Sequence, residues 1–389
     1  MQGDFEQSST RRHFLANLAS GGVAVALSQN QTRGETAAAR TDSVPMLHAT
    51  DLYRPHADPD DHWDLASVYA LDYQGRVELK GVMIDFPPPG QLLNPDVMAV
   101  AQMNYLTGRA VPVMTGSPRV IAREQAGTAA AQADLVGARA MLEILRRSPR
   151  PVVINIVGSA RDVALASKLE PQLFAAKCGG IYLNAGSGSQ DKAKAAQLEY
   201  NVSLDSASYA AIFQLPCPIY WMPCFEYAKD HNVAEWGTYY RFRHDDVLPF
   251  LSDRLQSYFA LMYKHGEVAR ESQAVRGPQW DWLSYLTKPK DAELLAKQGP
   301  KFRNMWCTAG FLHAVGLTVS PDGRIVPRGE ATDAVFSFDP IHVRCAPNGI
   351  TEWTPDATAR DRYIFHVRDL KNYQSAMTSA LKSLLKTLQ

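Results

Sequence analysis

The sequence lacks the features that identify several large classes of protein. Its 389 residues contain 40 lysines and arginines against 40 aspartates and glutamates, so the formal net charge is zero. A neutral chain has no general attraction to nucleic acid or to an anionic membrane surface. Beyond the N-terminal segment, no apolar run reaches the roughly 18 residues that a membrane-spanning helix needs. We therefore expect a small-molecule partner, with no nucleic acid and no membrane span.

Cysteine is scarce, and its spacing excludes the common metal-finger motifs. The five cysteines form no C-x-x-C pair and are Cys178, Cys217, Cys224, Cys307 and Cys345. Cys217 and Cys224 are nearest in sequence and would be the first candidates for a disulfide. A buried, apolar, reduced cysteine is the simpler expectation for most of them.

The N-terminus has the composition of an export signal. Arg11 and Arg12 precede a short apolar stretch that ends near Leu27, and small residues at 24–26 suit a cleavage site. The pattern S-T-R-R-x-F-L resembles a bacterial twin-arginine signal, which is an address and not an anchor. A short amphipathic helix with chance arginines is the alternative. We expect residues 1–41 to be signal and disordered spacer, and the mature protein to be periplasmic or extracellular.

From residue 42 onward, strand-like and helix-like segments alternate. Strands are expected at 44–50, 77–84, 110–114, 151–157, 180–183 and 218–222. Helices are expected at 64–73, 95–106, 126–147, 161–168 and 206–213. This alternation is typical of a mainly parallel central sheet with helices on both faces, the α/β class.

After residue 225 the pattern loosens. An amphipathic helix is expected at 247–263, a strand at 363–367 and a helix at 370–388. Residues 266–303 are polar and rich in Trp, Lys and Pro, so we expect an insertion or lid there. Residues 42–389 are expected to form a single domain around this insertion.

A cluster of aspartates follows the first expected strand. Asp51 ends that strand, and Asp58, Asp60, Asp61 and Asp64 precede an apolar helix. Ligands of open α/β sheets bind at the carboxyl ends of the strands. A hard cation such as Ca²⁺, which takes about six to eight oxygen ligands, would relieve the repulsion between these carboxylates. A solvated turn that caps the helix is the alternative.

Several segments resemble, in order, blocks of the inosine-uridine preferring nucleoside hydrolase family. Thr50-Asp51, an insertion and then DPDDHWDLASVYAL resemble the family's D-x-D-P-G-x-D-D and its apolar helix. The further blocks are VELKGVMI (77–84), YLTGRAVPVMTG (105–116), VGSARDVALASKLEP (157–171), GGIYLNAGSGS (179–189) and QLEYNVSLDSASYAAIF (197–213). The resemblance covers residues 44–320 and implies the nucleoside hydrolase fold, a single α/β domain around a mainly parallel sheet.

The resemblance implies a hydrolase that cleaves the N-glycosidic bond of a ribonucleoside or a related compound. Aspartates of the family's first motif bind Ca²⁺, which holds the attacking water and the ribose diol. Carried over, Asp51 would ligate the metal and deprotonate the water, and Asp60, Asp61 and Asp64 would compete for the remaining metal positions. Asp58 could replace Asp51, because Asp58-Pro59 also matches the D-P of the motif.

The resemblance also implies substrate-binding residues. Glu199 and Asn201 match the E-x-N pair that hydrogen-bonds the ribose hydroxyls, although an ordinary turn before a helix is the alternative. Asn184 follows the strand expected at 180–183, and Asp85 stands where the family has an asparagine after its second strand. Trp306 would stack on a base, or serve equally as a core aromatic.

The segment FLHAVGL resembles the family's H-D-P-x-A motif, which makes His313 the candidate acid for the leaving base. A structural histidine within an apolar helix is the alternative. Two departures weaken the metal site: Ala314 stands at a later metal-binding aspartate, and Arg161 at a threonine that offers a backbone oxygen. A second hypothesis is therefore a non-catalytic nucleoside- or sugar-binding protein, and a third is a hydrolase for a different sugar-like substrate. Family members are commonly dimers or tetramers, so the resemblance also allows a homo-oligomer.

Overall fold

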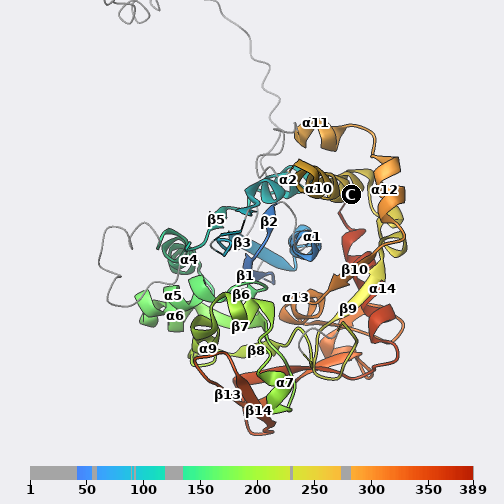
Figure 1. The fold of residues 1–389 in the computed structure, drawn as a ribbon. Coiled ribbons are helices and arrows are strands. Elements are labelled where there is room, and N and C mark those ends of the chain that lie inside the picture. The colour runs from blue at the N-terminus through green and yellow to red at the C-terminus, as the bar shows by residue number, and fades with distance from the viewer. Residues whose placement is uncertain are drawn as a thin grey trace, which may run out of the picture. The chain divides into compact units, whose positions relative to one another are not determined.

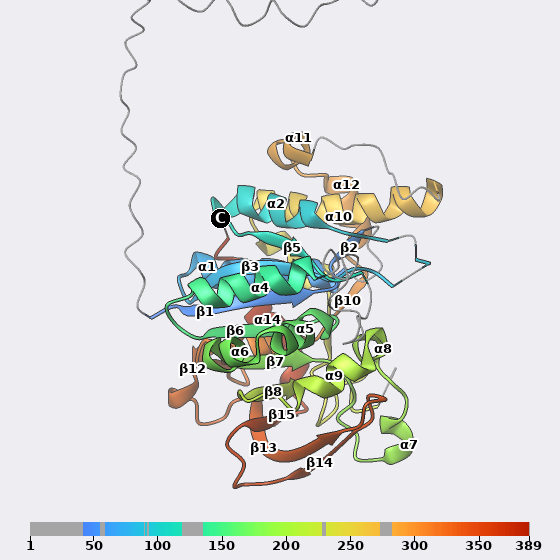
Figure 2. The ribbon, with the colours of Figure 1, turned by 90° about the vertical axis from the view of Figure 1, so that its left-hand side faces the viewer.

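A mainly parallel sheet organises the residues that this computed structural model describes, which are 42–54, 59–88, 90–91, 93–118, 135–227, 231–272 and 282–388. Its strands are β1 (Val44–Thr50), β3 (Val77–Ile84), β5 (Val113–Thr115), β6 (Val152–Ile156), β7 (Cys178–Asn184), β8 (Ile219–Met222), β13 (Phe336–Cys345), β14 (Thr351–Pro355) and β15 (Arg362–Val367). They run in the order β14-β13-β15-β8-β7-β6-β1-β3-β5 (Figures 1 and 2). Neighbours from β5 to β15 are parallel, and β13 pairs antiparallel with β15 and β14. The expected α/β sheet is thereby confirmed.

Helices cover both faces of the sheet (Figure 1). One face carries α1 (Asp60–Tyr73), α13 (Thr308–Ala314) and α14 (Tyr373–Leu385), and the other carries α4 (Val136–Arg147), α5 (Arg161–Leu169) and α9 (Ser206–Ile212). Successive side chains of a strand point to opposite faces. Accordingly, Met46 belongs to one apolar core and its neighbour Leu47 to the other. Burial on both sides explains why the parallel strands read as continuous apolar runs.

The first two strands of the parallel sheet, β1 and β3, have the bounds expected from the sequence, and a buried aspartate directly follows each of them. The first helix differs, since α1 begins at Asp60, four residues earlier than expected. Asp60, Asp61 and Asp64 consequently belong to the helix and are buried. The segment expected to be export signal and spacer, residues 1–41, and Asp58 lie outside the described residues.

The C-terminal half departs most from expectation. The helix expected at 247–263 is wrong at its start: Leu248–Phe250 forms a 3₁₀ turn around Pro249, and α10 (Asp253–Ser272) begins only afterwards. The hairpin of β13 and β14 was not expected, because Asp339-Pro340 interrupts the apolar alternation of β13. That interruption is where β13 changes partner, from β15 to β14.

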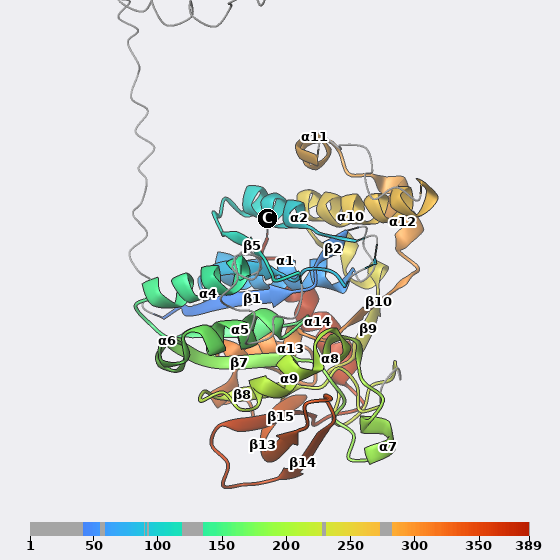
Figure 3. The same cartoon turned by 60° about the vertical axis from the view of Figure 1, so that its left-hand side comes forward.

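The segment expected as an insertion or lid is mainly helical where it is described. It contains the end of α10, α11 (Trp282–Thr287) and α12 (Ala292–Gln298). These helices gather beside α2 (Val97–Thr107), at the β5 end of the sheet (Figures 2 and 3). None of the helices in the described ranges is both long and apolar enough to cross a membrane.

Candidate functional site

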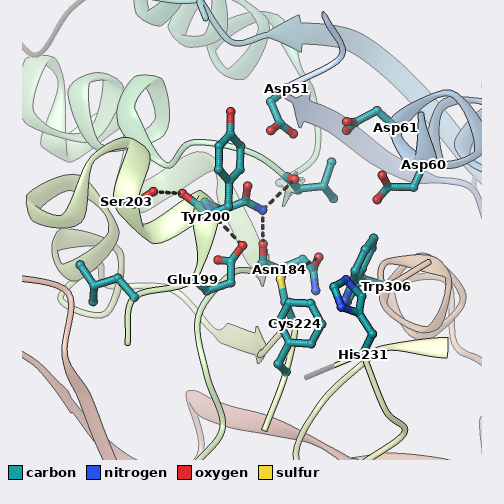
Figure 4. A pocket seen from close by; sticks show the side chains of 14 residues that line it. Asp51, Asp60, Asp61, Asn184, Glu199, Tyr200, Ser203, Cys224, His231 and Trp306 are labelled. Atoms are coloured by element: carbon teal, nitrogen blue, oxygen red, sulfur yellow. Dashed lines mark hydrogen bonds between the residues drawn. The ribbon is translucent and has the colours of Figure 1, made fainter. Parts of the chain in front are cut away.

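A cavity of about 400 Å³ opens at the carboxyl ends of the parallel strands (Figure 4). Its volume suits a small organic molecule. Its walls come from the ends of β1, β6, β7 and β8, from the start of α1 and from the turn before α13. The lining residues are Asp51, Asp60, Asp61, Val157, Asn184, Leu198, Glu199, Tyr200, Asn201, Ser203, Cys224, Phe225, His231 and Trp306.

Asp51, Asp60 and Asp61 bring three carboxylates to one side of the cavity (Figure 4). Asp51 directly follows β1, and the other two form the first turn of α1. Thr50 Oγ1 donates a 2.6 Å hydrogen bond to Asp61 Oδ1. The N-terminal end of a helix favours negative charge, which lowers the cost of burying carboxylates there. The structure therefore brings together three of the aspartates that the sequence pointed to.

Asp64 lies one turn further along α1 and does not line the cavity. It faces Cys307, the residue at the start of α13. Burial, followed by the negative charge of Asp64, raises the pKa of the Cys307 thiol well above its ordinary value. Cys307 Sγ also donates to Asn184 Oδ1 at 3.2 Å. Cys307, not Ala314, is therefore the α13 residue beside the acidic cluster.

The carboxylates have the chemistry of a calcium site but not its closed geometry. Carboxylate oxygens are ligands that Ca²⁺ prefers, and Asp51, Asp60 and Asp61 supply several of them at one side of the cavity. Across the described ranges, no three His, Cys, Asp or Glu side chains converge on a common point as they stand. The donor set fits the ion, and its assembly around one would require these side chains to adjust.

Glu199 and Asn184 lie on the opposite side of the cavity (Figure 4), and Asn201, two residues after Glu199, also lines the cavity. Glu199 caps α8 (Tyr200–Leu204): Oε1 accepts from Asn201 N and Oε2 from Gly186 N, each at 2.9 Å. Asn201 Nδ2 donates to Val157 O and Asn184 O, both at 3.1 Å. Glu199 therefore caps a helix, as expected for an ordinary turn before a helix. It also faces the cavity. These bonds hold the polar side chains in defined orientations.

Aromatic rings form a third wall of the cavity. Phe225 meets Trp306 edge to face with ring centroids 5.7 Å apart, and His231 packs against both rings. Trp306 was expected at the site, whereas Tyr200, Ser203, Cys224, Phe225 and His231 were not. The only sequence signal for Phe225 and His231 is that they follow β8, at the carboxyl end of a strand.

His313 does not line the cavity. Its Nδ1 lies 2.8 Å from the hydroxyl of Tyr182, its Nε2 contacts the guanidinium of Arg328, and its ring packs against Phe338. Burial, followed by the charge of Arg328, lowers its pKa to about 3. The resemblance to the H-D-P-x-A motif placed the candidate acid at His313 and a missing metal ligand at Ala314. Both residues lie at the end of α13 that points away from the cavity. The residues at the cavity end are Trp306 and Cys307.

Asp85 is buried behind the acidic wall and does not reach the cavity surface. Its carboxylate accepts a hydrogen bond from Ser159 N. Burial, then the charge of Asp51, raises the pKa of Asp85 well above its ordinary value. Gly158 is in close contact with both aspartates. A Cβ added at this position would lie 2.5 Å from Asp85 Oδ2 and 2.7 Å from Asp51 N, so the site has no room for a side chain there.

Arg161, the unusual residue of the family-like block, is turned away from the cavity. Its guanidinium donates to Ser117 O at 3.0 Å and to Leu204 O at 3.1 Å, and lies 3.5 Å from a carboxylate oxygen of Asp205. It therefore fastens the start of α5 to the end of α8, and so supports the wall that carries Glu199 and Asn201.

Comparison with known proteins shows similarity in structure at low sequence identity. No protein-family model and no curated protein matches the chain. A purine-preferring ribonucleoside hydrolase from Gardnerella vaginalis superposes with a TM-score of 0.51 at 12% identity, over 88% of this chain and 99% of that one. A plant nucleoside hydrolase gives 0.50 at 12% identity, over 87% and 99%. The effector protein XOO4466 gives 0.50 at 15% identity, over 89% and 95%. This chain therefore has the nucleoside hydrolase fold.

Proposed function

We propose that the protein hydrolyses the N-glycosidic bond of a ribonucleoside or a closely related N-ribosyl compound. One observation carries the proposal: a cavity in this fold sets three carboxylates against a hydrogen-bonded Glu-Asn wall, with aromatic rings at its third side. The first two walls suit a polyhydroxylated sugar, and the third suits a planar base. A second, smaller cavity near α2 is lined mainly by apolar residues such as Met103 and Leu106, and lacks this combination.

The charges of the walls suit the reaction. Cleavage of a glycosidic bond places positive charge on the sugar and negative charge on the departing group. Asp51 and Asp61 would stabilise the sugar cation, and Asp51 would accept a proton from the attacking water. Glu199 and Asn201 would bind the ribose hydroxyls from the other side.

His231 is the proposed proton donor to the leaving base. Its ring lies on the aromatic wall, against Trp306, where a stacked base would be within reach. His313, the histidine favoured by sequence, is engaged with Tyr182 and Arg328 outside the cavity. Histidine is the side chain that most often serves as a general acid in enzymes.

Ca²⁺ is the proposed cofactor, with Asp51, Asp60 and Asp61 as the residues that would hold it. Bound there, the ion would act as a Lewis acid that makes water a stronger nucleophile at neutral pH. It would also offset the mutual repulsion of these carboxylates. Metal binding should therefore stabilise the folded protein as well as activate it.

A non-catalytic nucleoside- or sugar-binding protein is the second candidate. The observation in its favour is that the acidic side chains among the described residues do not close around one point. A hydrolase for another sugar-like substrate would share the carboxylates and the Glu-Asn wall but not the fit to a base.

The deciding experiment measures turnover and binding on the same preparation. Purified protein is incubated with inosine, guanosine, adenosine, uridine and cytidine in buffer with Ca²⁺, and free base is quantified by chromatography. We expect base release that a chelator abolishes and that the Asp51→Asn variant lacks. Calorimetric binding of a nucleoside without release would support the binding protein instead, and neither binding nor release would exclude both.

A further inference from the structure

We propose that Cys178 and Cys217 form an oxidisable pair that closes to an intramolecular disulfide. The two sulfurs lie 3.4 Å apart, although the residues are 39 positions apart in the sequence. Cys178 begins β7, and Cys217 lies two residues before β8. All five cysteines are reduced in this structure, so the pair is a thiol–thiol contact.

The backbone supports the pairing. β7 and β8 are parallel neighbours, with Ile181 opposite Ile219 and Ile181 N donating to Pro218 O at 2.8 Å. Cys217 is thereby held beside the first residues of β7. Formation of a disulfide needs neighbouring Cα atoms and Cβ atoms that face each other, which a direct thiol–thiol contact provides. The sulfurs need to approach by only an ångström or so, roughly the difference between this contact and the ~2.0 Å of a disulfide bond.

Cys217 is the thiol suited to react first. Arg362 donates to its carbonyl oxygen at 3.0 Å and to Leu215 O at 2.8 Å, which places a guanidinium next to the pair. The hydrogen bond from Cys178, together with the charge of Arg362, lowers the pKa of Cys217. The thiolate is the reactive form of cysteine, so oxidation should begin at Cys217. Both side chains are less than a tenth exposed, which favours a small oxidant.

A peroxide is the oxidant that we assign to the reaction. The Cys217 thiolate attacks one peroxide oxygen, breaks the O–O bond and becomes a sulfenic acid while hydroxide leaves. The Cys178 sulfur then attacks the Cys217 sulfur, and the S–O bond breaks as the disulfide forms. Together the two thiols lose two electrons and two protons, and hydrogen peroxide becomes two molecules of water.

The pairing differs from the one that sequence spacing favours. Cys224, the nearest cysteine to Cys217 in sequence, follows the opposite end of β8 and lines the cavity. Its sulfur lies 3.6 Å from Asn184 Oδ1, at the carboxyl ends of the strands. The strand that separates Cys217 from Cys224 therefore excludes a bond between them in the folded protein.

The bond would close a loop that contains one wall of the cavity. Asn184, Glu199, Tyr200, Asn201 and Ser203 all lie between the two cysteines, whereas the sulfurs lie at the other ends of β7 and β8. The disulfide would thus link the two ends of this segment at a point away from the cavity, and would not change the cavity lining. Closing a loop of this length removes conformational freedom from the unfolded chain and stabilises the fold.

The test treats the purified full chain with a low excess of hydrogen peroxide and maps its peptides without reduction. We expect a cross-linked peptide pair containing Cys178 and Cys217, and a melting temperature about 5 °C higher that dithiothreitol reverses. Cys345→Ser, which removes a different buried cysteine, should keep both results. Cys217→Ser should lose both.

Recovery of both residues as free thiols after peroxide treatment, or a cross-link from Cys217 to another cysteine, would overturn the proposal. Peptide mapping of the unsubstituted protein decides the matter even where Cys217→Ser fails to fold. The outcome is independent of nucleoside hydrolysis, because both readouts concern the cysteines and the fold alone.

Discussion

Thr50 Oγ1 donates a 2.6 Å hydrogen bond to Asp61 Oδ1, which links the last residue of β1 to the first turn of α1. The bond is buried, and it orients a carboxylate that faces the cavity. Through this bond, Asp51, which directly follows β1, and Asp60 and Asp61, which begin α1, present their carboxylates as one wall.

Replacement of Thr50 by Val should therefore affect both stability and the site. A buried hydrogen bond to a charged group contributes about 1.5–3 kcal/mol, so the free energy of unfolding should fall by roughly that amount. Urea denaturation measures it, and Thr50→Ser, which keeps the hydroxyl, is the matched control. A Val variant as stable as the unsubstituted protein would show that the bond contributes nothing.

Asp51→Asn should abolish catalysis and leave the fold intact. The amide is isosteric with the carboxylate but cannot accept a proton, and removal of a general base typically costs about 10²–10⁴-fold in rate. The measurements are kcat for nucleoside hydrolysis and the melting temperature. Asp322→Asn, at an exposed turn, should change neither. Undiminished turnover by Asp51→Asn would assign the base to another residue.

His231→Gln should slow the release of a poor leaving group far more than that of a good one. Loss of an acid should reduce kcat for nucleosides by about 10²-fold or more. A riboside with a nitrophenolate leaving group needs no protonation, so its hydrolysis should be nearly unaffected. His313→Gln should leave this ratio unchanged, because His313 lies outside the cavity. Equal losses for both substrates would remove His231 from the role of acid.

His48 should make the fold sensitive to acid. It is fully buried in β1 beside Phe311, and neither ring nitrogen has a hydrogen-bond partner among the described residues. Burial lowers its pKa to about 3 from 6.5. The unfolded chain therefore binds a proton that the folded chain does not, and stability falls as pH decreases from 6.5 toward 3.

The pH dependence of unfolding measures this contribution. One such proton corresponds to about 1.4 kcal/mol per pH unit within that window. His48→Leu should flatten the dependence, whereas the same change at His342, whose side chain is exposed, should not. An unchanged slope in His48→Leu would show that other groups account for acid unfolding.

Export should depend on the paired arginines of the N-terminus. Lysine in place of both Arg11 and Arg12 keeps the charge but removes the twin-arginine pattern. We expect the double variant to remain in the cytoplasmic fraction, with the unsubstituted protein outside it, as judged by immunoblot of fractionated cells. Equal export of the two would assign the segment to another route or to no signal.

The sequence was sufficient for the parallel half of the fold. β1 and the second half of β3 are buried on both faces, and their mostly apolar side chains mark the two strands in the sequence. The hairpin of β13 and β14 was missed because its alternation breaks at Asp339-Pro340, where the strand changes partner. The position of such a break depends on which strands lie beside β13 in the folded protein. The local sequence of β13 does not contain that information.

The acidic side of the site was also predictable, because its residues adjoin the end of a strand. The aromatic side was not. Phe225 and His231 line the cavity because of the course that the chain takes after β8. The spacing of apolar residues in the sequence does not predict that course. The position of His313 was not predictable for a related reason: Trp306 precedes α13 and His313 lies near its end, and only packing decides which of them meets the cavity.

The position of β15 has a consequence for synthesis of the protein. β15 lies between β8 and β13, yet its residues follow both in the chain. Until residue 367 has left the ribosome, β8 has an open edge, and the hairpin of β13 and β14 has no sheet to join. Unpaired edges of this kind are where partly folded chains associate. A nascent chain of this protein should therefore depend on chaperones until late in translation.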